Sequence, residues 1–134
     1  MGDQVTILLV EDDIASLCAM EKLLRSNGYT VLAAKTAEEA LQIAERQQFD
    51  LLLSDIMLPG QSGIDLMRAM KPQYGKRGLA ITGSVAPEVV EGARDAGFSK
   101  CLKKPVIFSA LMQAVEELLQ EKPSSAPFIS KTPM

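Results

Sequence analysis

The alternation of short apolar runs with amphipathic segments is the feature that most constrains the fold. Five runs rich in aliphatic and β-branched residues recur along the chain, and runs of this kind are typical of strands buried on both faces. They span residues 5–10, 30–34, 50–55, 78–82 and 100–103. A segment with helical periodicity follows each run. This repeat predicts an α/β fold: a doubly wound, five-stranded parallel sheet with helices on both faces and right-handed crossovers.

The helical segments carry start and stop signals. The first is expected over residues 14–27, and a capping box at Thr36–Glu39 opens the second. A short third helix is expected to end at Pro72, because proline cannot donate the backbone hydrogen bond that would continue it. The fourth is expected over 87–96, before a glycine. The fifth, over about 107–121, has the clearest apolar stripe.

Length and composition describe one ordinary domain. The chain of 134 residues predicts a single domain over 1–121, followed by a flexible Pro/Ser-rich tail or linker over 122–134. A net charge of −3 argues against direct nucleic-acid binding, and no apolar run approaches the ~20 residues of a membrane span. Cys18 and Cys101 lack metal-like spacing, which is typical of reduced thiols in a cytoplasmic protein. With no histidine in the chain, His-based catalysis within it is excluded.

Polar residues gather where the predicted strands end. In a doubly wound sheet, ligands bind outside the carboxyl ends of the strands. The residues at these ends are Glu11, Asp12, Asp13, Asp55, Thr82 and Lys104. Each alone has a plain structural explanation, such as helix capping by Asp13. Their convergence on one rim indicates a functional site.

Four motifs resemble the receiver domain of two-component response regulators. They are LLVEDD, SDIMLPGQSG, AITG and LKKP, in this order along the chain. The resemblance covers residues 5 to about 121 and implies a flavodoxin-like sheet in the order 2-1-3-4-5 with five helices. The segment KPQYGKRG, together with AITGS, resembles receivers fused to hybrid sensor histidine kinases. A receiver excised from such a kinase and a single-domain regulator both stay open.

The resemblance also implies roles for the rim residues. Asp55 is implied to accept a phosphoryl group, and Thr82 and Lys104 to contact it. The implied Mg²⁺ ligands are Asp12, Asp13, Asp55 and the backbone carbonyl of Met57. A hard cation suits these oxygens, because two carboxylates about 4 Å apart repel by about 4 kcal/mol at an effective dielectric near 20. Two roles stay open for Glu11: its side chain either helps to shape the pocket or takes a solvated position at its edge.

Three rival functions would draw on the same residues. A flavin-binding flavodoxin needs hydrogen-bond donors in its first loop, whereas EDD offers only acceptors. An aspartyl-phosphate phosphatase would carry a second Asp where Met57 stands, so no turnover enzyme is expected beyond Mg²⁺-dependent self-phosphorylation of Asp55. The remaining alternative is a receiver-like interaction module that works without phosphorylation.

The implied partners are a sensor histidine kinase or a histidine phosphotransfer domain as phosphoryl donor, and a downstream effector that the sequence does not identify. A homodimer through the face of helix 4, strand 5 and helix 5 is a further expectation. Cys101 stands where many receivers carry an aromatic residue, which predicts that phosphorylation moves residues 83–87 and changes little near Cys101. The equal alternative is that Cys101 is only a buried thiol and that the output surface lies elsewhere, such as on the first helix. Met57 and Ser84 offer no carboxylate or amide to orient water, which predicts slow hydrolysis of the phosphoryl group.

Overall fold

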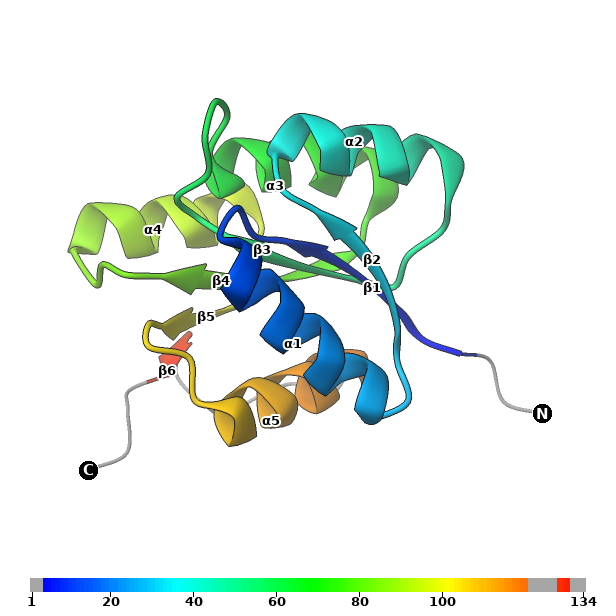
Figure 1. The fold of residues 1–134 in the computed structure, drawn as a ribbon. Coiled ribbons are helices and arrows are strands. Elements are labelled where there is room, and N and C mark those ends of the chain that lie inside the picture. The colour runs from blue at the N-terminus through cyan, green and yellow to red at the C-terminus, as the bar shows by residue number, and fades with distance from the viewer. Residues whose placement is uncertain (1–3, 121–127, 131–134) are drawn as a thin grey trace.

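The computed structural model describes residues 4–120 and 128–130, which form a parallel sheet between two layers of helices (Figure 1). The strands are β1 (Thr6–Val10), β2 (Thr30–Ala34), β3 (Leu51–Asp55), β4 (Arg77–Thr82), β5 (Lys100–Lys103) and β6 (Ile129–Ser130). The helices are α1 (Ile14–Ser26), α2 (Ala37–Arg46), α3 (Gly63–Tyr74), α4 (Pro87–Ala96) and α5 (Phe108–Leu119).

The strand order is β2-β1-β3-β4-β5-β6, and every neighbouring pair is parallel. The predicted flavodoxin-like order 2-1-3-4-5 with five helices is therefore confirmed. The sixth strand is an addition that the sequence did not predict. It has two residues, pairs with β5 and falls within the expected tail, of which residues 122–127 and 131–134 lie outside the described residues.

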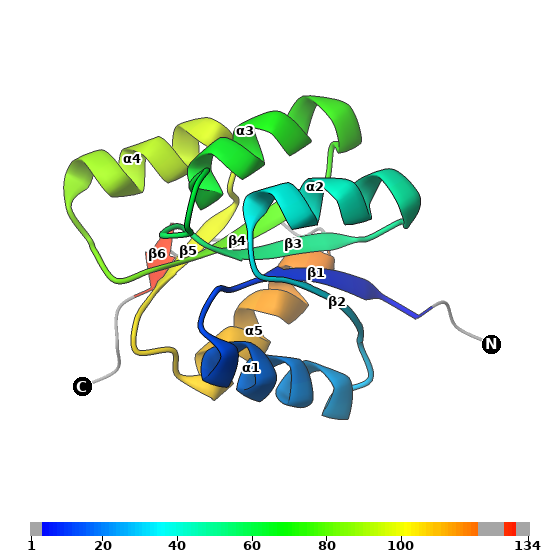
Figure 2. The same ribbon diagram turned by 45° about the horizontal axis from the view of Figure 1, so that its top comes forward.

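The sheet is buried on both faces because successive strand side chains point to opposite sides. In β1, Leu8 and Val10 pack into the cluster beneath α2, α3 and α4, whereas Ile7 and Leu9 pack into the cluster beneath α1 and α5. All four are fully buried. Figure 2 shows this division, with α2, α3 and α4 above the sheet and α1 and α5 below it. Both faces being covered explains the near-continuous apolar runs of the strands.

The third helix is longer than the sequence predicted. The expectation that Pro72 ends it is wrong: α3 runs through Pro72 to Tyr74. The proline lies in the last turn, so it removes one backbone donor and the helix continues for only two further residues. Gly75 ends the helix instead, in the left-handed conformation with φ of 65°, and its N–H donates to the Lys71 carbonyl.

The second helix begins at its predicted cap. The Thr36 hydroxyl accepts from the N–H of Glu39 at 3.0 Å. The Glu39 carboxylate accepts from the N–H of Lys35 at 2.7 Å, one residue earlier than in a standard capping box. Within the described part of the chain, no helix is both long enough and apolar enough to cross a membrane.

Candidate metal and phosphoryl site

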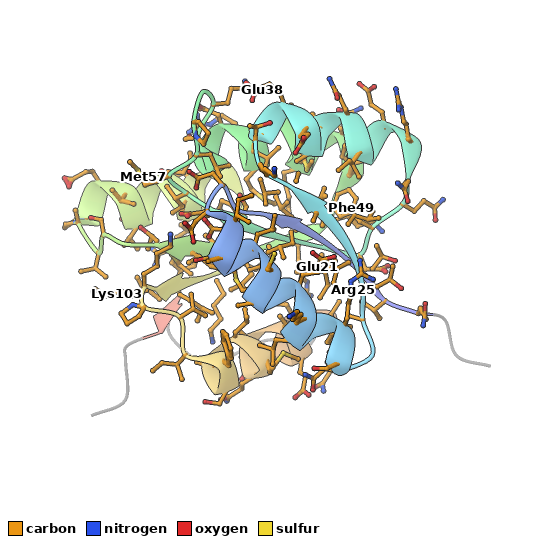
Figure 3. The ribbon with its side chains drawn as sticks, in the orientation of Figure 1. Glu21, Arg25, Glu38, Phe49, Met57 and Lys103 are labelled. Atoms are coloured by element: carbon orange, nitrogen blue, oxygen red, sulfur yellow. The ribbon has the colours of Figure 1, made fainter. Side chains whose placement is uncertain are left out.

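The carboxyl ends of four strands meet at one edge of the sheet. Figure 3 shows Met57 and Lys103 toward this edge, whereas Phe49, which precedes β3, lies toward the other end. Because β1, β3, β4 and β5 are parallel neighbours, the residues at their ends are brought together, as the sequence analysis expected. The geometry of this edge can therefore be built residue by residue.

Asp55 ends β3 at the centre of the site and is only 2% exposed. One carboxylate oxygen, Oδ1, accepts from the backbone N–H of Met57 at 3.1 Å. The other, Oδ2, accepts from Nζ of Lys104 at 2.6 Å. A buried carboxylate is tolerated when it is paired and hydrogen-bonded, and both oxygens of Asp55 meet that condition.

A cluster of carboxylates surrounds Asp55. Glu11, Asp12 and Asp55 each offer one oxygen, and these oxygens lie within 4.8 Å of one another. Glu11 is 1% exposed, and its Oε2 accepts from the N–H of Asp13 at 3.0 Å. Its other oxygen, Oε1, is buried without a hydrogen-bond partner and lies 3.9 Å from Nζ of Lys104. A buried polar atom without a hydrogen bond is rare and needs an explanation.

The charged groups of this cluster shift the pKa values of Glu11 and Lys104. Burial raises the pKa of Glu11, and the charges of Asp55 and Asp12 raise it further, against the opposing effects of the Asp13 hydrogen bond and Lys104. Burial acts to lower the pKa of Lys104, but its hydrogen bond and charge interaction with Asp55 raise it overall. Three carboxylates facing one ammonium leave two negative charges, which a divalent cation would neutralise.

The cluster fits a magnesium ion. Mg²⁺ prefers hard oxygen ligands and is commonly held by one or two carboxylates together with water and phosphate oxygens. The three carboxylates supply only oxygen, and Glu11 also has one buried oxygen, Oε1, without a hydrogen-bond partner. No other group of three or more potential metal ligands occurs among residues 4–120 and 128–130.

Asp13 takes a different role in the structure from the one implied for it. It is the N-cap of α1, and its carboxylate accepts from the N–H of Ser16 at 2.9 Å, a bond that lowers the pKa of Asp13. Asp13 does not belong to the carboxylate cluster, where Glu11 stands beside Asp12 instead. The alternative of a solvated edge position for Glu11 is wrong, because the side chain is almost completely buried.

Thr82 and Met57 lie beside the cluster. Thr82 ends β4 and is 1% exposed; its hydroxyl donates to the Ser84 carbonyl and accepts from the Ser84 N–H, both at 3.0 Å. The hydroxyl is thus turned toward the loop that follows β4. The Met57 side chain is 73% exposed, whereas its backbone N–H is committed to Asp55. The role of the Met57 carbonyl as a metal ligand stays a prediction.

Gly63 lets the start of α3 pack against the backbone of Asp55, a role that the sequence did not predict. A Cβ atom at this position would lie 2.1 Å from the Asp55 carbonyl oxygen and 2.9 Å from Cα of Ile56. The N–H of Gly63 donates to the Ile56 carbonyl at 2.8 Å. Only glycine lets the start of α3 approach the backbone of Asp55 so closely. The cap of this helix lies next to Gly63: the Ser62 hydroxyl accepts from the N–H of Asp65 at 3.1 Å.

The surface around the site is unusually apolar. Four large hydrophobic side chains are exposed in the described part of the chain, and each follows one of the four strands that end here. They are Ile14, Met57, Val85 and Phe108. A cleft of about 350 Å³ runs from Glu11 and Lys104 between α1 and the start of α5, lined mainly by apolar atoms. The apolar lining of this cleft and the nearby exposed side chains are compatible with contact by another protein.

Comparison with known proteins gives one consistent result. The family model for the response regulator receiver domain matches residues 7–116. The chain is 31% identical over 119 residues to a cyclic di-GMP phosphodiesterase of Thermotoga maritima, covering 88% of this chain and 32% of that protein. It is 31% identical over 125 residues to the sensor histidine kinase AruS of Pseudomonas aeruginosa, covering 90% of this chain and 12% of that protein.

A solved structure with the same fold is the CheY-like response regulator receiver domain protein of Methanospirillum hungatei JF-1. It superposes with a TM-score of 0.84 at 34% identity, covering 89% of this chain and 96% of the other. The two curated relatives are much longer proteins, of which this chain spans about a third or less. The similarity therefore concerns one domain of those relatives.

Proposed function

The chain belongs to the response regulator receiver domain family, and from this we propose that Asp55 accepts a phosphoryl group from a phosphohistidine of a partner protein. The observation that carries the proposal is the arrangement around Asp55. A buried carboxylate, bonded by Lys104 at 2.6 Å, lies within 4.8 Å of two further carboxylates. A nucleophile, a cation to meet phosphoryl oxygens and a set of metal ligands are thus combined at one edge of the sheet.

The transfer follows from the position of Asp55. A carboxylate oxygen of Asp55 attacks the phosphorus atom, and an acyl phosphate bond forms. The bond between phosphorus and the imidazole nitrogen of the donor breaks, its electron pair stays on the ring, and the ring takes up a proton from water. Lys104 is placed to donate to the phosphoryl oxygens, since its Nζ already lies at hydrogen-bond distance from Asp55.

We propose Mg²⁺ as the cofactor, held by Glu11, Asp12 and Asp55, with the Met57 carbonyl as a further ligand. When bound, the cation would offset the repulsion between this acidic edge and an incoming phosphoryl group. Glu11 takes the place that the family resemblance gave to Asp13, because the carboxylate of Asp13 caps α1.

Thr82 links the site to a loop. Its hydroxyl is bonded to the backbone of Ser84, so contact with a phosphoryl group requires at least the bond to the Ser84 carbonyl to break. Loss of that bond would release residues 83–87 to take a new position. This coupling supports the expectation that the loop after β4, rather than the surface near Cys101, reports phosphorylation.

A protein donor is supported by the apolar surface. Phe108, which is 45% exposed, lines the cleft between α1 and α5 together with Lys104. A sensor histidine kinase or a histidine phosphotransfer domain is the proposed partner, in the cytoplasm. A homodimer through α4, β5 and α5 is proposed as well.

We propose that the domain holds the phosphoryl group and hydrolyses it only slowly. Met57 offers a thioether and Ser84 a hydroxyl at the approach to Asp55, and neither provides a carboxylate to activate water. An interaction module that works without phosphorylation is the less favoured alternative, since every element needed for the chemistry is present.

Labelling with acetyl phosphate and Mg²⁺ tests the proposal. Intact-mass measurement should show one added phosphoryl group, lost in Asp55→Asn and kept in the control Asp95→Asn, which alters an exposed carboxylate on α4. Labelling of Asp55→Asn at the unaltered rate would refute the assignment of Asp55. Absence of labelling in the unaltered chain with both acetyl phosphate and a phosphohistidine donor would favour the interaction module.

A further inference from the structure

The outer edge of β5 is covered by a short segment from the C-terminal region. Figure 2 shows β6 beside β5 at the end of the sheet. The N–H of Cys101 donates to the Phe128 carbonyl at 2.8 Å, and the register pairs Cys101 with Ile129 and Leu102 with Ser130. Without this segment, β5 would present unpaired backbone groups to any extended chain.

Side chains add specificity to this backbone pairing. Phe128 and Ile129 are partly buried and pack against the hydrophobic cluster beneath α2, α3 and α4. The guanidinium carbon of Arg94 on α4 lies 4.8 Å from the centre of the Phe128 ring, within the range of a cation–π interaction. Arg94 is held in place by Glu91 at 3.0 Å. An aromatic residue followed by a β-branched one is thus recognised at this edge.

We propose that the β5 edge and Arg94 form a docking site for an extended protein segment of this kind, and that Phe128–Ser130 fills it from within the same chain. Strand addition of this type draws affinity from backbone hydrogen bonds and specificity from alternate side chains. The tethered segment has an effective concentration of the order of millimolar, so it competes with any partner that adds a strand to β5. The segment acts as a built-in competitor for that surface.

The docking site is joined to the phosphoryl site through the strand itself. β5 ends at Lys103, and the next residue is Lys104, whose N–H donates to the Thr82 carbonyl at 2.7 Å and whose ammonium group binds Asp55. The docking does not depend on phosphoryl transfer, because none of its contacts involves Asp55. Its measurement therefore distinguishes failure of the docking site from failure of the proposed chemistry.

A peptide-binding experiment tests this site on the full chain. A fluorescent peptide of residues 124–132, SSAPFISKT, is titrated into the unaltered chain and into the double variant Phe128→Ala/Ile129→Ala. The variant should bind at least about tenfold more tightly, because its own segment no longer competes. A peptide with alanine in place of the phenylalanine should bind neither, and Arg94→Gln added to the double variant should weaken binding by about two- to fivefold.

Amide exchange provides an independent reading. The Cys101 N–H should exchange slowly in the unaltered chain and at least about tenfold faster in the double variant, while the amides of β1 and β3 stay protected and show that the variant is folded. Three results would overturn the proposal. They are equal peptide affinity in the two chains, no measurable binding to the folded double variant, or unchanged exchange at Cys101.

Discussion

Replacing Glu11 by glutamine should stabilise the metal-free protein and weaken its binding of Mg²⁺. The substitution keeps an oxygen that can accept from the N–H of Asp13, now bonded at 3.0 Å, and removes one negative charge from the cluster. The new amide group also brings donors to the position where Oε1 has no partner. Shape and burial change little, so the effect is chiefly electrostatic.

The size of the effect follows from three charge interactions. At the 4.8 Å limit of the cluster and an effective dielectric near 20, Asp55 and Asp12 each repel Glu11 by about 3 kcal/mol. Lys104, at 3.9 Å, attracts it by about 4 kcal/mol on the same scale. The balance is unfavourable by roughly 2–3 kcal/mol, and screening of the exposed Asp12 reduces the expected gain in stability to about 1–2 kcal/mol.

The gain should depend on pH. The pKa of Glu11 is raised in the folded protein above its ordinary value of 4.5, so ionisation of Glu11 disfavours folding at high pH. The advantage of glutamine is therefore full at alkaline pH, shrinks as the pH falls through the folded-state pKa, and is absent below about 4.5. Saturating Mg²⁺ should reverse the order of stability, because the unaltered chain gains more from binding it.

Denaturant unfolding of Glu11→Gln across this pH range, with and without Mg²⁺, measures all three effects. The control is Glu45→Gln, which removes an exposed charge from α2, distant from the site, and should change stability by less than about 0.5 kcal/mol at every pH. The reasoning fails if Glu11→Gln is less stable than the unaltered chain at alkaline pH without Mg²⁺, or if Mg²⁺ stabilises both equally.

Three further results are expected. Asp13→Ala should lower the melting temperature by about 2–6 °C through loss of the α1 cap and leave Mg²⁺ affinity nearly unchanged; loss of Mg²⁺ binding without a change in melting temperature would make Asp13 a ligand. Gly63→Ala should cost about 2 kcal/mol or more of stability in calorimetry, because the added Cβ meets the backbone carbonyl of Asp55, and it should slow the proposed phosphorylation. Gly83→Ala, with open space around its Cβ, should be nearly neutral. A thiol reagent at about pH 8 should label the exposed Cys18 and spare Cys101. Burial raises the pKa of Cys101 to about 12, so about one in ten thousand of these thiols is ionised at that pH. Fast labelling of both thiols in the folded chain would contradict this.

The fold was predictable because both signals that define it are local. Apolar runs such as residues 5–10 and 50–55 identify buried strands, and their alternation with helices leaves few topologies. The predicted end of α3 was wrong because Pro72 lies in the last turn of the helix, and the helix ends instead at the left-handed Gly75. Strand β6 was unpredictable, because two residues in a Pro/Ser-rich segment carry no periodicity and depend entirely on the free edge of β5.

The convergence of Asp55, Thr82 and Lys104 was predictable, because all three stand at the ends of neighbouring strands. The different positions that the three consecutive acids after β1 take in the structure were not predictable. Glu11, Asp12 and Asp13 all carry a carboxylate, but the surroundings of the three side chains differ. Side chains alternate along β1, with Leu9 facing α1 and α5 and Val10 facing the opposite side, and Glu11 continues this alternation into the cleft between α1 and α5. Because Glu11 continues the alternation by one residue, its carboxylate is buried beside Lys104.

The chain then leaves the strand, and the remaining two acids meet different partners. Asp12 is exposed at the rim with one oxygen in the cluster, and Asp13 turns back to hold the first turn of α1. The helix cap fixes the direction in which the chain leaves β1 and so holds the loop between the strand and α1. The three like charges are therefore divided: Glu11 and Asp12 belong to the carboxylate cluster, whereas Asp13 satisfies a backbone N–H that would otherwise lack a partner.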